Sequence, residues 1–235
     1  MRAPWQPDVY DAPSKLVIVG AGESAEIAYE YFTHDSPHNV VGFAVEQQFR
    51  TAEQLEGLPV VDLEQMAEAF PPNEHLAFVA VSSTHLNRLR RRLFDTVKEA
   101  GFACASYVSS HAFVWRNVSI GENVFVFEDN VVQHRVRIGD NVVLWSGNHL
   151  GHRTVIGDDC FIASHVVISG FCVIGRRSFV GVNACFADGV TVGEDSVVGA
   201  GAVVIGDLPP RGVYVGNPAR STGGDPLQTF NVPGA

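Results

Sequence analysis

Apolar residues recur at every sixth position over residues 108–209. From Val108, this stretch divides into seventeen hexads without insertion or deletion, and every first position is Val, Ile, Leu or Phe. The fifth position is mostly small or β-branched, and glycine recurs at the second. A period of six would scatter apolar residues around an α-helix, whereas in a parallel β-helix each first position points inward and stacks on its equivalents. The pattern predicts a parallel β-helix, because its unbroken register excludes the irregular loops of a β-sandwich.

The residues before the hexads alternate between strand-like and helix-like segments. Residues 15–32 indicate a buried strand, a glycine turn and a helix with apolar residues at helical spacing. Further strands and helices are predicted within residues 39–46, 58–70, 75–83 and 84–102. This alternation predicts a small α/β unit with a mostly parallel sheet.

Composition and charge narrow the classes of partner. The chain has 235 residues and a formal net charge of −10, which repels nucleic acid. The basic segment 88–94 lies in a predicted helix and is interpreted as a solvated helix face. The cysteines form no CxxC motif, and Cys160, Cys172 and Cys185 are interpreted as packing residues. We expect no membrane partner and a reducing, cytoplasmic location, because the chain shows neither a membrane-length apolar run nor a signal-peptide core.

Three motifs add to the repeat. "IVGAGESAEIA" opens the α/β unit, "GHRTVIG" lies within the hexads, and "VYVGNPAR" follows them. With the hexads, these motifs resemble the sugar acyltransferase family over residues 15–221. That family of left-handed β-helix, hexapeptide-repeat enzymes includes N-acetyltransferases of nucleotide-linked 4-amino sugars and relatives of sialic acid O-acetyltransferases.

The resemblance implies a domain organisation and a set of ligands. Residues 15–107 would form an α/β half-Rossmann unit that holds a nucleotide-linked sugar, residues 108–221 an all-β left-handed parallel β-helix, and residues 222–235 a tail. Acetyl-CoA would be the co-substrate. The family forms homotrimers with the active site between neighbouring helices, and a trimer would also cover one flat face of each prism.

Histidines fall at particular corners of the predicted coils. If three hexads make one coil, residues eighteen apart stack about 4.8 Å apart. His134, His152 and Gly170 then form one row, whereas His149 lies in another column and stays undecided between turn and site. Two histidines at other positions are interpreted as ordinary polar residues: His111 and His165.

His152 also occupies the place of the family's catalytic histidine. An amine or a hydroxyl needs a base to attack a thioester, and a histidine supplies one near neutral pH. Gly170, one coil on, would either offer a backbone N–H to the oxyanion or leave room for the thioester arm. The family often has an acid after the base, but this chain has Arg153. Three residues are candidates to orient His152 instead: Asn148, Asp140 and Asp158.

The resemblance also places substrate and coenzyme contacts. The glycine turn and the end of the second strand would hold the nucleotide-sugar, which also fits the N–H groups that such a turn presents to phosphate. The predicted substrate-binding residues are Gly20, Gly22, Glu23, Ser24, Glu46, His134, Asn148 and His149. The predicted coenzyme-binding residues are Gly170, Val182, Ala200, Gly216, Asn217, Pro218 and Arg220. Arg176, Arg177, Arg211 and Arg220 are candidate phosphate partners.

The leading hypothesis is an acetyl-CoA-dependent N-acetyltransferase of a nucleotide-linked amino sugar. Its nearest rival is an O-acetyltransferase, or a transferase of another acyl group, acting on a sugar or sialic acid. A metal-dependent hydratase of the same fold is a further alternative, but zinc carbonic anhydrases of this fold use histidines about five residues apart. No two histidines in residues 108–209 have that spacing, so no metal is expected. A non-catalytic nucleotide-sugar binding protein is the remaining alternative.

Overall fold

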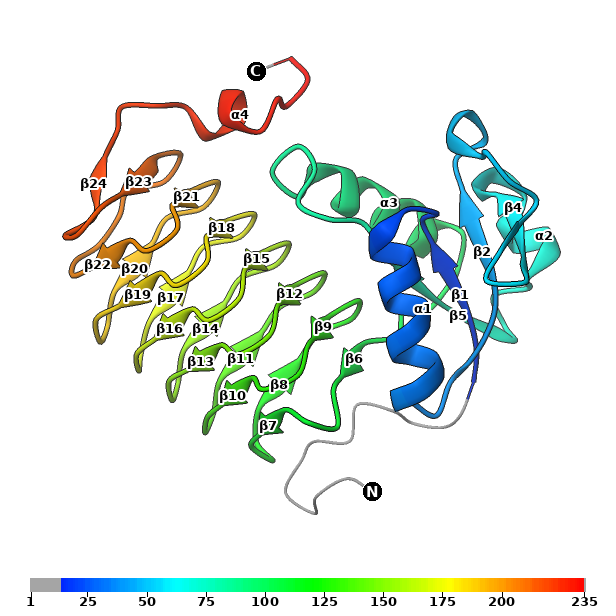
Figure 1. Ribbon diagram of the computed structural model, residues 1–235, viewed down its shortest axis with the longest axis horizontal. Coiled ribbons are helices and arrows are strands. Elements are labelled where there is room, and N and C mark those ends of the chain that lie inside the picture. The colour runs from blue at the N-terminus through cyan, green and yellow to red at the C-terminus, as the bar shows by residue number, and fades with distance from the viewer. Residues whose placement is uncertain (1–13, 235) are drawn as a thin grey trace.

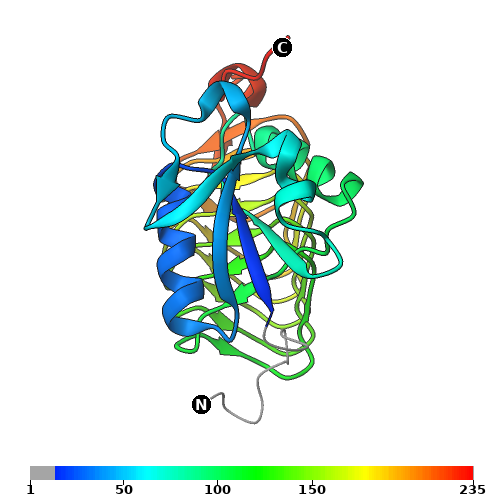
Figure 2. The same ribbon diagram turned by 90° about the vertical axis from the view of Figure 1, so that its right-hand side faces the viewer.

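The computed structural model describes residues 14–234, and its N-terminal part is an α/β unit (Figures 1 and 2). Its five-stranded sheet has the order β3-β4-β2-β1-β5, and all strands except β3 are parallel. The strands are β1 (Lys15–Val19), β2 (Asn39–Val45), β3 (Gln54–Leu55), β4 (Leu58–Asp62) and β5 (His75–Val79). The helices are α1 (Glu23–Asp35), α2 (Met66–Ala69), α3 (Arg88–Glu99) and two 3₁₀ helices, η1 (Gln47–Phe49) and η2 (Leu63–Gln65). The predicted α/β unit is confirmed.

Helix α3 begins later than the apolar spacing predicts. His85, Leu86 and Asn87 have φ values of 54°, 50° and 65°, which lie in the left-handed region and cannot continue a right-handed helix. The side chain of Leu86 is fully buried and anchors this loop. The segment between β5 and α3 is therefore a loop with a defined conformation.

The hexads form the predicted left-handed parallel β-helix. Residues eighteen apart pair in parallel, as His149 does with Val131 on one side and Val167 on the other. Seventeen two-residue strands build three sheets: β6 (Tyr107–Val108), β7 (Phe113–Val114), β8 (Ser119–Ile120), β9 (Phe125–Val126), β10 (Val131–Val132), β11 (Arg137–Ile138), β12 (Val143–Leu144), β13 (His149–Leu150), β14 (Val155–Ile156), β15 (Phe161–Ile162), β16 (Val167–Ile168), β17 (Val173–Ile174), β18 (Phe179–Val180), β19 (Cys185–Phe186), β20 (Thr191–Val192), β21 (Val197–Val198) and β22 (Val203–Val204). Strand β23 (Val213–Val215) and antiparallel β24 (Arg220–Ser221) extend the β6–β21 sheet.

The interior is filled by the first and fifth positions of the hexads. Leu144, Leu150 and Ile162 are fully buried first positions, and Val142 and Cys160 are fully buried fifth positions. Third and fourth positions turn the chain at the corners of the triangular coil. Most non-glycine fourth positions adopt the left-handed conformation that the corner requires, with φ between 55° and 61° in Asn123, Asp129, Arg135, Asn141, Arg153, Asp159, His165, Phe171, Arg177, Asn183 and Asp195.

The coil has three corners, and we name two of them. The histidine corner, between the β7–β22 and β8–β20 sheets, comprises residues 116–117, 134–135, 152–153, 170–171 and 188–189. The docking corner, between the β8–β20 and β6–β23 sheets, comprises residues 122–123, 140–141, 158–159, 176–177 and 194–195. The remaining corner includes Val182 and Ala200.

The α/β unit packs on the outer face of the β6–β23 sheet (Figures 1 and 2). Tyr31 and Phe32 of α1 meet the outward ring of Phe125 edge-on, with ring centroids 5.7 and 6.1 Å away. At the C-terminal end of the β-helix, helix α4 (Pro226–Thr229) folds back toward the α/β unit. Its residue Leu227 packs with Leu86 and Val197. The two parts of the chain therefore share apolar contacts at both ends of this sheet.

Candidate active site

The histidine corner brings the predicted row together. Backbone hydrogen bonds link successive coils at this corner. Arg153 N–H donates to His134 O, and Phe171 N–H donates to His152 O, both at 2.9 Å. His134 and His152 are exposed, and Gly170 is buried. The next member of the row is Asp188, which is absent from the predicted site although it lies eighteen residues beyond Gly170.

The imidazole of His152 lies over the α-carbon of Gly170. A Cβ at Gly170 would approach Cε1, Nδ1 and Nε2 of His152 to 2.6, 2.9 and 3.0 Å. The ring also meets Phe171 edge-on, with centroids 4.9 Å apart, and the backbone N–H of His152 donates to Gln133 Oε1 at 3.1 Å. Within residues 14–234, neither ring nitrogen of His152 has a hydrogen-bond partner. The corner thus positions an exposed imidazole by its backbone and by packing, and leaves both nitrogens for other groups.

The backbone N–H of Gly170 donates to Oδ1 of Asp188 at 2.8 Å. An N–H engaged in this way is not free to stabilise an oxyanion. The space that Gly170 provides is occupied by the His152 ring. In this conformation the glycine makes room for the imidazole.

The three residues predicted to orient His152 lie elsewhere in the protomer. Asn148 is buried within the coil, where it donates to Trp145 O and accepts from Val166 N–H. Asp140 and Asp158 lie at the docking corner, and each accepts a backbone N–H from the coil before it. Arg153, which follows the histidine, places its guanidinium 5.8 Å from the centre of the Phe171 ring.

The other histidines have different surroundings. His134 is 3.2 Å from Asn117 through its Nδ1 atom. His149 is a half-buried strand residue on a flat face of the prism, so it lies apart from the His152 row. His165 packs against Gly147, and His111 is exposed.

The glycine turn follows β1 at the carboxyl edge of the parallel sheet. Gly20 has a φ of 134°, and a Cβ there would lie 2.7 Å from Ala80 O, so both space and conformation favour glycine. Gly22 caps the 13-residue helix α1, and Glu23 and Ser24 begin its first turn. A pocket next to the turn is lined by Gly20, Gly22 and Glu46. Both carboxylate oxygens of Glu46 accept from Arg92, at 3.0 and 2.9 Å.

The predicted coenzyme residues lie in three places on one protomer. Gly170 is at the histidine corner, whereas Val182 and Ala200 are exposed at the remaining corner. The segment Gly216 to Arg220 closes the last coil, because Gly216 O accepts from Val203 N–H and Ala219 N–H donates to Val203 O. A groove beside this segment is lined by Asp207, Tyr214 and Arg220.

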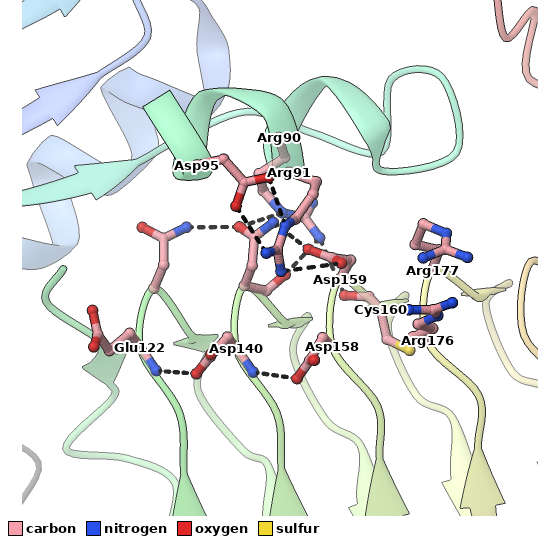
Figure 3. Close-up of polar contacts among 12 residues, drawn as sticks. Arg90, Arg91, Asp95, Glu122, Asp140, Asp158, Asp159, Cys160, Arg176 and Arg177 are labelled. Carbon is pink, nitrogen blue, oxygen red and sulfur yellow. Dashed lines mark hydrogen bonds and ion pairs between the residues drawn. The ribbon is translucent and has the colours of Figure 1, made fainter. Parts of the chain in front are cut away.

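Helix α3 covers the docking corner (Figure 3). This contact shows that the prediction for the basic segment 88–94 was wrong. The sequence predicts a solvated face for the basic segment 88–94, but Arg90 is 1% exposed. Arg90 donates to Asn141 Oδ1 and to the carbonyls of Asn141 and Cys160 on the β-helix, and to the carbonyls of Val81 and Ser82 after β5. Burial lowers the pKa of Arg90 to about 10, which still leaves it charged at neutral pH. The guanidinium carries five N–H donors in a planar fork, which suits it to bind several carbonyl groups at once.

Further polar contacts hold the same corner. Asn123 donates to Asn141, and Asn141 donates to Asp159, each at 2.8 Å. Arg88 and Arg177 both bind Asp195. Arg176 pairs with Glu194, so two of the four candidate phosphate partners, Arg176 and Arg177, are held in ion pairs.

The described residues offer neither a metal cluster nor a membrane span. Among residues 14–234, no group of three histidine, cysteine or acidic side chains is arranged to hold a metal ion. No helix in that range is both long and apolar enough to cross a membrane. Cys160 and Cys172 are buried and donate to backbone carbonyls, and burial raises the pKa of Cys160 to about 12.

Comparisons with known proteins agree with this geometry. The profile of the bacterial transferase hexapeptide (six repeats) family matches residues 117–152, 135–170 and 171–206. Among curated proteins, no sequence matches the chain. PerB from Caulobacter crescentus, solved with CoA and GDP-perosamine, is 29% identical over 90% of this chain and 99% of its own, with a TM-score of 0.79.

A second similar structure is the acetyltransferase domain of PglB from Neisseria gonorrhoeae. It is 26% identical over 88% of this chain and 98% of its own, with a TM-score of 0.77. The same domain was solved with acetyl coenzyme A, at 25% identity over 89% of this chain and 100% of its own, with a TM-score of 0.77. The repeat, the α/β unit before it and the likeness over nearly the whole chain identify this protein as an acyltransferase of the left-handed β-helix, hexapeptide-repeat class.

Proposed function

We propose that the protein is an acetyl-CoA-dependent N-acetyltransferase that acts on the amino group of a nucleotide-linked amino sugar, with His152 as general base. The observation that carries this proposal is the likeness over 90% of the chain, at 29% identity, to a structure that holds CoA and GDP-perosamine. The exposed imidazole of His152, with both ring nitrogens open, supplies the chemistry that such a reaction needs.

The proposed reaction moves one proton through His152. An ammonium group has no free lone pair, so it first loses one proton to solvent and reacts as the neutral amine. His152 accepts a second proton from the nitrogen as it attacks the thioester carbonyl. The tetrahedral intermediate collapses when the carbon–sulfur bond breaks, and the imidazolium returns the proton to the thiolate. The products are an amide and free CoA. A base in this position typically contributes about 10²- to 10⁴-fold in rate.

The substrates are assigned to two regions. The glycine turn, with Gly22, Glu23, Ser24 and the end of β2, holds the nucleotide-sugar. Acetyl-CoA runs along the β-helix near Gly170, Val182 and Ala200 and ends at the segment Gly216 to Arg220. Because these residues lie at two corners and one end of a protomer, a shared site in a homotrimer would bring them together. Light scattering tests this arrangement, and a monomer at working concentration would contradict it.

A sugar hydroxyl is the second candidate acceptor. Arg153 follows the histidine where an acid would hold the imidazole, and none of the three predicted orienting residues reaches His152 within the protomer. The choice between an amine and a hydroxyl acceptor therefore depends on which group orients the imidazole of His152.

The test is CoA release from acetyl-CoA by wild-type protein, with a panel of UDP-, GDP- and dTDP-linked 3-amino and 4-amino sugars. We expect turnover with one amino sugar and none with its hydroxyl counterpart. Turnover with hydroxyl sugars alone would replace the amine by an alcohol acceptor. No turnover with either class would overturn the proposed function.

A further inference from the structure

The chain between β5 and α3 contains a short segment of the opposite hand to an α-helix. His85, Leu86 and Asn87 all have a left-handed backbone, and Asn87 N–H donates to Ser83 O at 3.1 Å. Residues other than glycine avoid this conformation, because their Cβ comes too close to the following carbonyl oxygen. Three such residues in a row persist only where the surrounding structure holds them, and strained backbone of this kind gathers at ligand clamps and switch regions. We name residues 85–87 the left-handed segment.

The left-handed segment joins two walls of the crevice at the glycine turn. Val81 precedes the segment and Leu89 follows it, and both line the pocket that also contains Gly22 and Glu46. This pocket, with a volume of about 300 Å³, lies where the nucleotide-linked sugar is assigned. The conformation of the left-handed segment therefore decides where two of the lining side chains stand.

Polar contacts hold the left-handed segment only in part. Nδ2 of Asn87 donates to Ser178 O and Arg88 donates to Leu86 O, both at 3.4 Å, which is long for a hydrogen bond. Oδ1 of Asn87 and Nδ1 of His85 are buried and have no partner within residues 14–234. The side chain of Leu86 is fully buried, so the apolar packing around it is the strongest contact that fixes the segment.

The C-terminal segment supplies that packing. Leu86 lies in one apolar cluster with Leu227 of α4 and Val197 of β21, and Phe230 packs against the same cluster. The ring of Phe230 also meets Phe179 of β18, with centroids 5.1 Å apart. Helix α4 lies near the loop that leads into α3 (Figure 1). The last residues of the chain thus cover the side chain that anchors the left-handed segment.

We propose that residues 225–232 form a latch, which holds the left-handed segment in place and thereby keeps the acceptor crevice in its binding shape. Leu86 and Leu227 are the positioning residues of this latch, and they act on the acceptor through Val81 and Leu89. Without the latch the strained segment relaxes, and the acceptor must then restore the crevice with part of its own binding free energy. Acetyl-CoA is assigned to other surfaces of the chain, so its binding does not depend on the latch. This inference rests on the proposed function and deepens it.

The first measurement follows amide hydrogen exchange in wild-type protein and in two variants, a chain that ends at Gly224 and Leu227→Ala. The backbone N–H of Asn87, which bonds to Ser83 O, is expected to exchange about tenfold faster in both variants. The N–H groups of α1 should exchange as they do in wild-type protein. The matched control is Gln228→Ala, an exposed position next to Leu227 on the same helix, and it should change neither rate.

The second measurement compares Michaelis constants, with the acceptor found in the panel. In both variants the KM for the nucleotide-linked sugar is expected to rise about five- to twentyfold, whereas kcat and the KM for acetyl-CoA stay within about twofold of wild type. This split distinguishes positioning from a general loss of stability, which would reduce the amount of active enzyme and leave both KM values unchanged.

Two kinds of result would overturn the latch. Unchanged exchange at Asn87 in the shortened chain would mean that the left-handed segment keeps its shape without residues 225–232. Faster exchange with an unchanged KM for the nucleotide-linked sugar, or with an equal rise in both KM values, would mean that these residues only cover the end of the β-helix. A wild-type protein that transfers no acetyl group to any sugar would instead overturn the proposed function, and this inference with it.

Discussion

The histidine corner and the docking corner use the same hexad positions in opposite ways. At the docking corner, Asn141 and Asp159 are buried under α3, and their polar atoms bind neighbouring coils and arginines. At the histidine corner, His134 and His152 are exposed, and the ring nitrogens of His152 are open. The backbone is the same repeat in both places. The difference lies in what covers it.

The two corners show which polar side chains stabilise the fold and which are available to a ligand. A polar side chain that is buried must be satisfied within the protein, and each of its partners then stabilises the fold. A side chain left open at a rigid corner contributes little to folding but is held ready for a ligand. We therefore expect substitutions at the docking corner to affect mainly stability, and substitutions at the histidine corner to affect mainly turnover.

The largest effect on stability is expected for Arg90→Met. The substitution leaves the carbonyls of Val81 and Asn141 without their donor in a buried place, whereas the carbonyl of Cys160 keeps its bond from Val143 N–H. We expect the free energy of unfolding to fall by about 3 kcal/mol. Urea denaturation measures it, with Arg91→Met as the control because Arg91 is half-exposed on the same helix. An equal loss in both variants would contradict the special role of the buried arginine.

Gly170→Ala should act on turnover. The new Cβ would lie 2.6 Å from Cε1 of His152, so the ring must move. We expect kcat to fall about ten- to a hundredfold, as misplacement of a catalytic group does. Gly206→Ala is the matched control, since it lies in the same column and a Cβ there meets nothing within 4 Å. Unchanged kcat in Gly170→Ala would show that the position of the ring does not matter.

A smaller, pH-dependent effect is expected for Asp195→Asn. Burial acts to raise the pKa of Asp195, but hydrogen bonds from Arg177 and Arg88 outweigh it and hold the pKa below its ordinary value of 3.8. A carboxyl with a lowered pKa stabilises the fold above its unfolded pKa and ceases to do so as pH falls through the folded value. The variant should be less stable by about 1 kcal/mol at pH 7, and the difference should shrink as the pH falls below about 4. Denaturation at several pH values measures this, and a difference that stays constant in acid would contradict the assignment.

The repeat makes the β-helix predictable residue by residue. A fixed period of six is enough to place His134, His152 and Gly170 in one row, and the observed register of His149 with Val167 confirms that arithmetic. The same arithmetic reaches Asp188, eighteen residues after Gly170, although the predicted site does not include it. The apolar alternation likewise predicts the α/β unit.

The docking of α3 could not be predicted in this way. An arginine-rich helix is normally a solvated surface, and only contact with the ladder of Asn123, Asn141 and Asp159 makes burial of Arg90 favourable. Such contacts join residues 51 and 70 positions apart, and no local pattern encodes them.

The most direct test of the account is His152→Asn, measured on one preparation for both kcat/KM in CoA release and the midpoint of thermal unfolding. The account predicts a loss of about 10²- to 10⁴-fold in kcat/KM with an almost unchanged midpoint, because the exposed imidazole is a base and not a packing residue. Near-normal turnover in a folded variant would contradict it, and would mean that the histidine corner is not the site of chemistry.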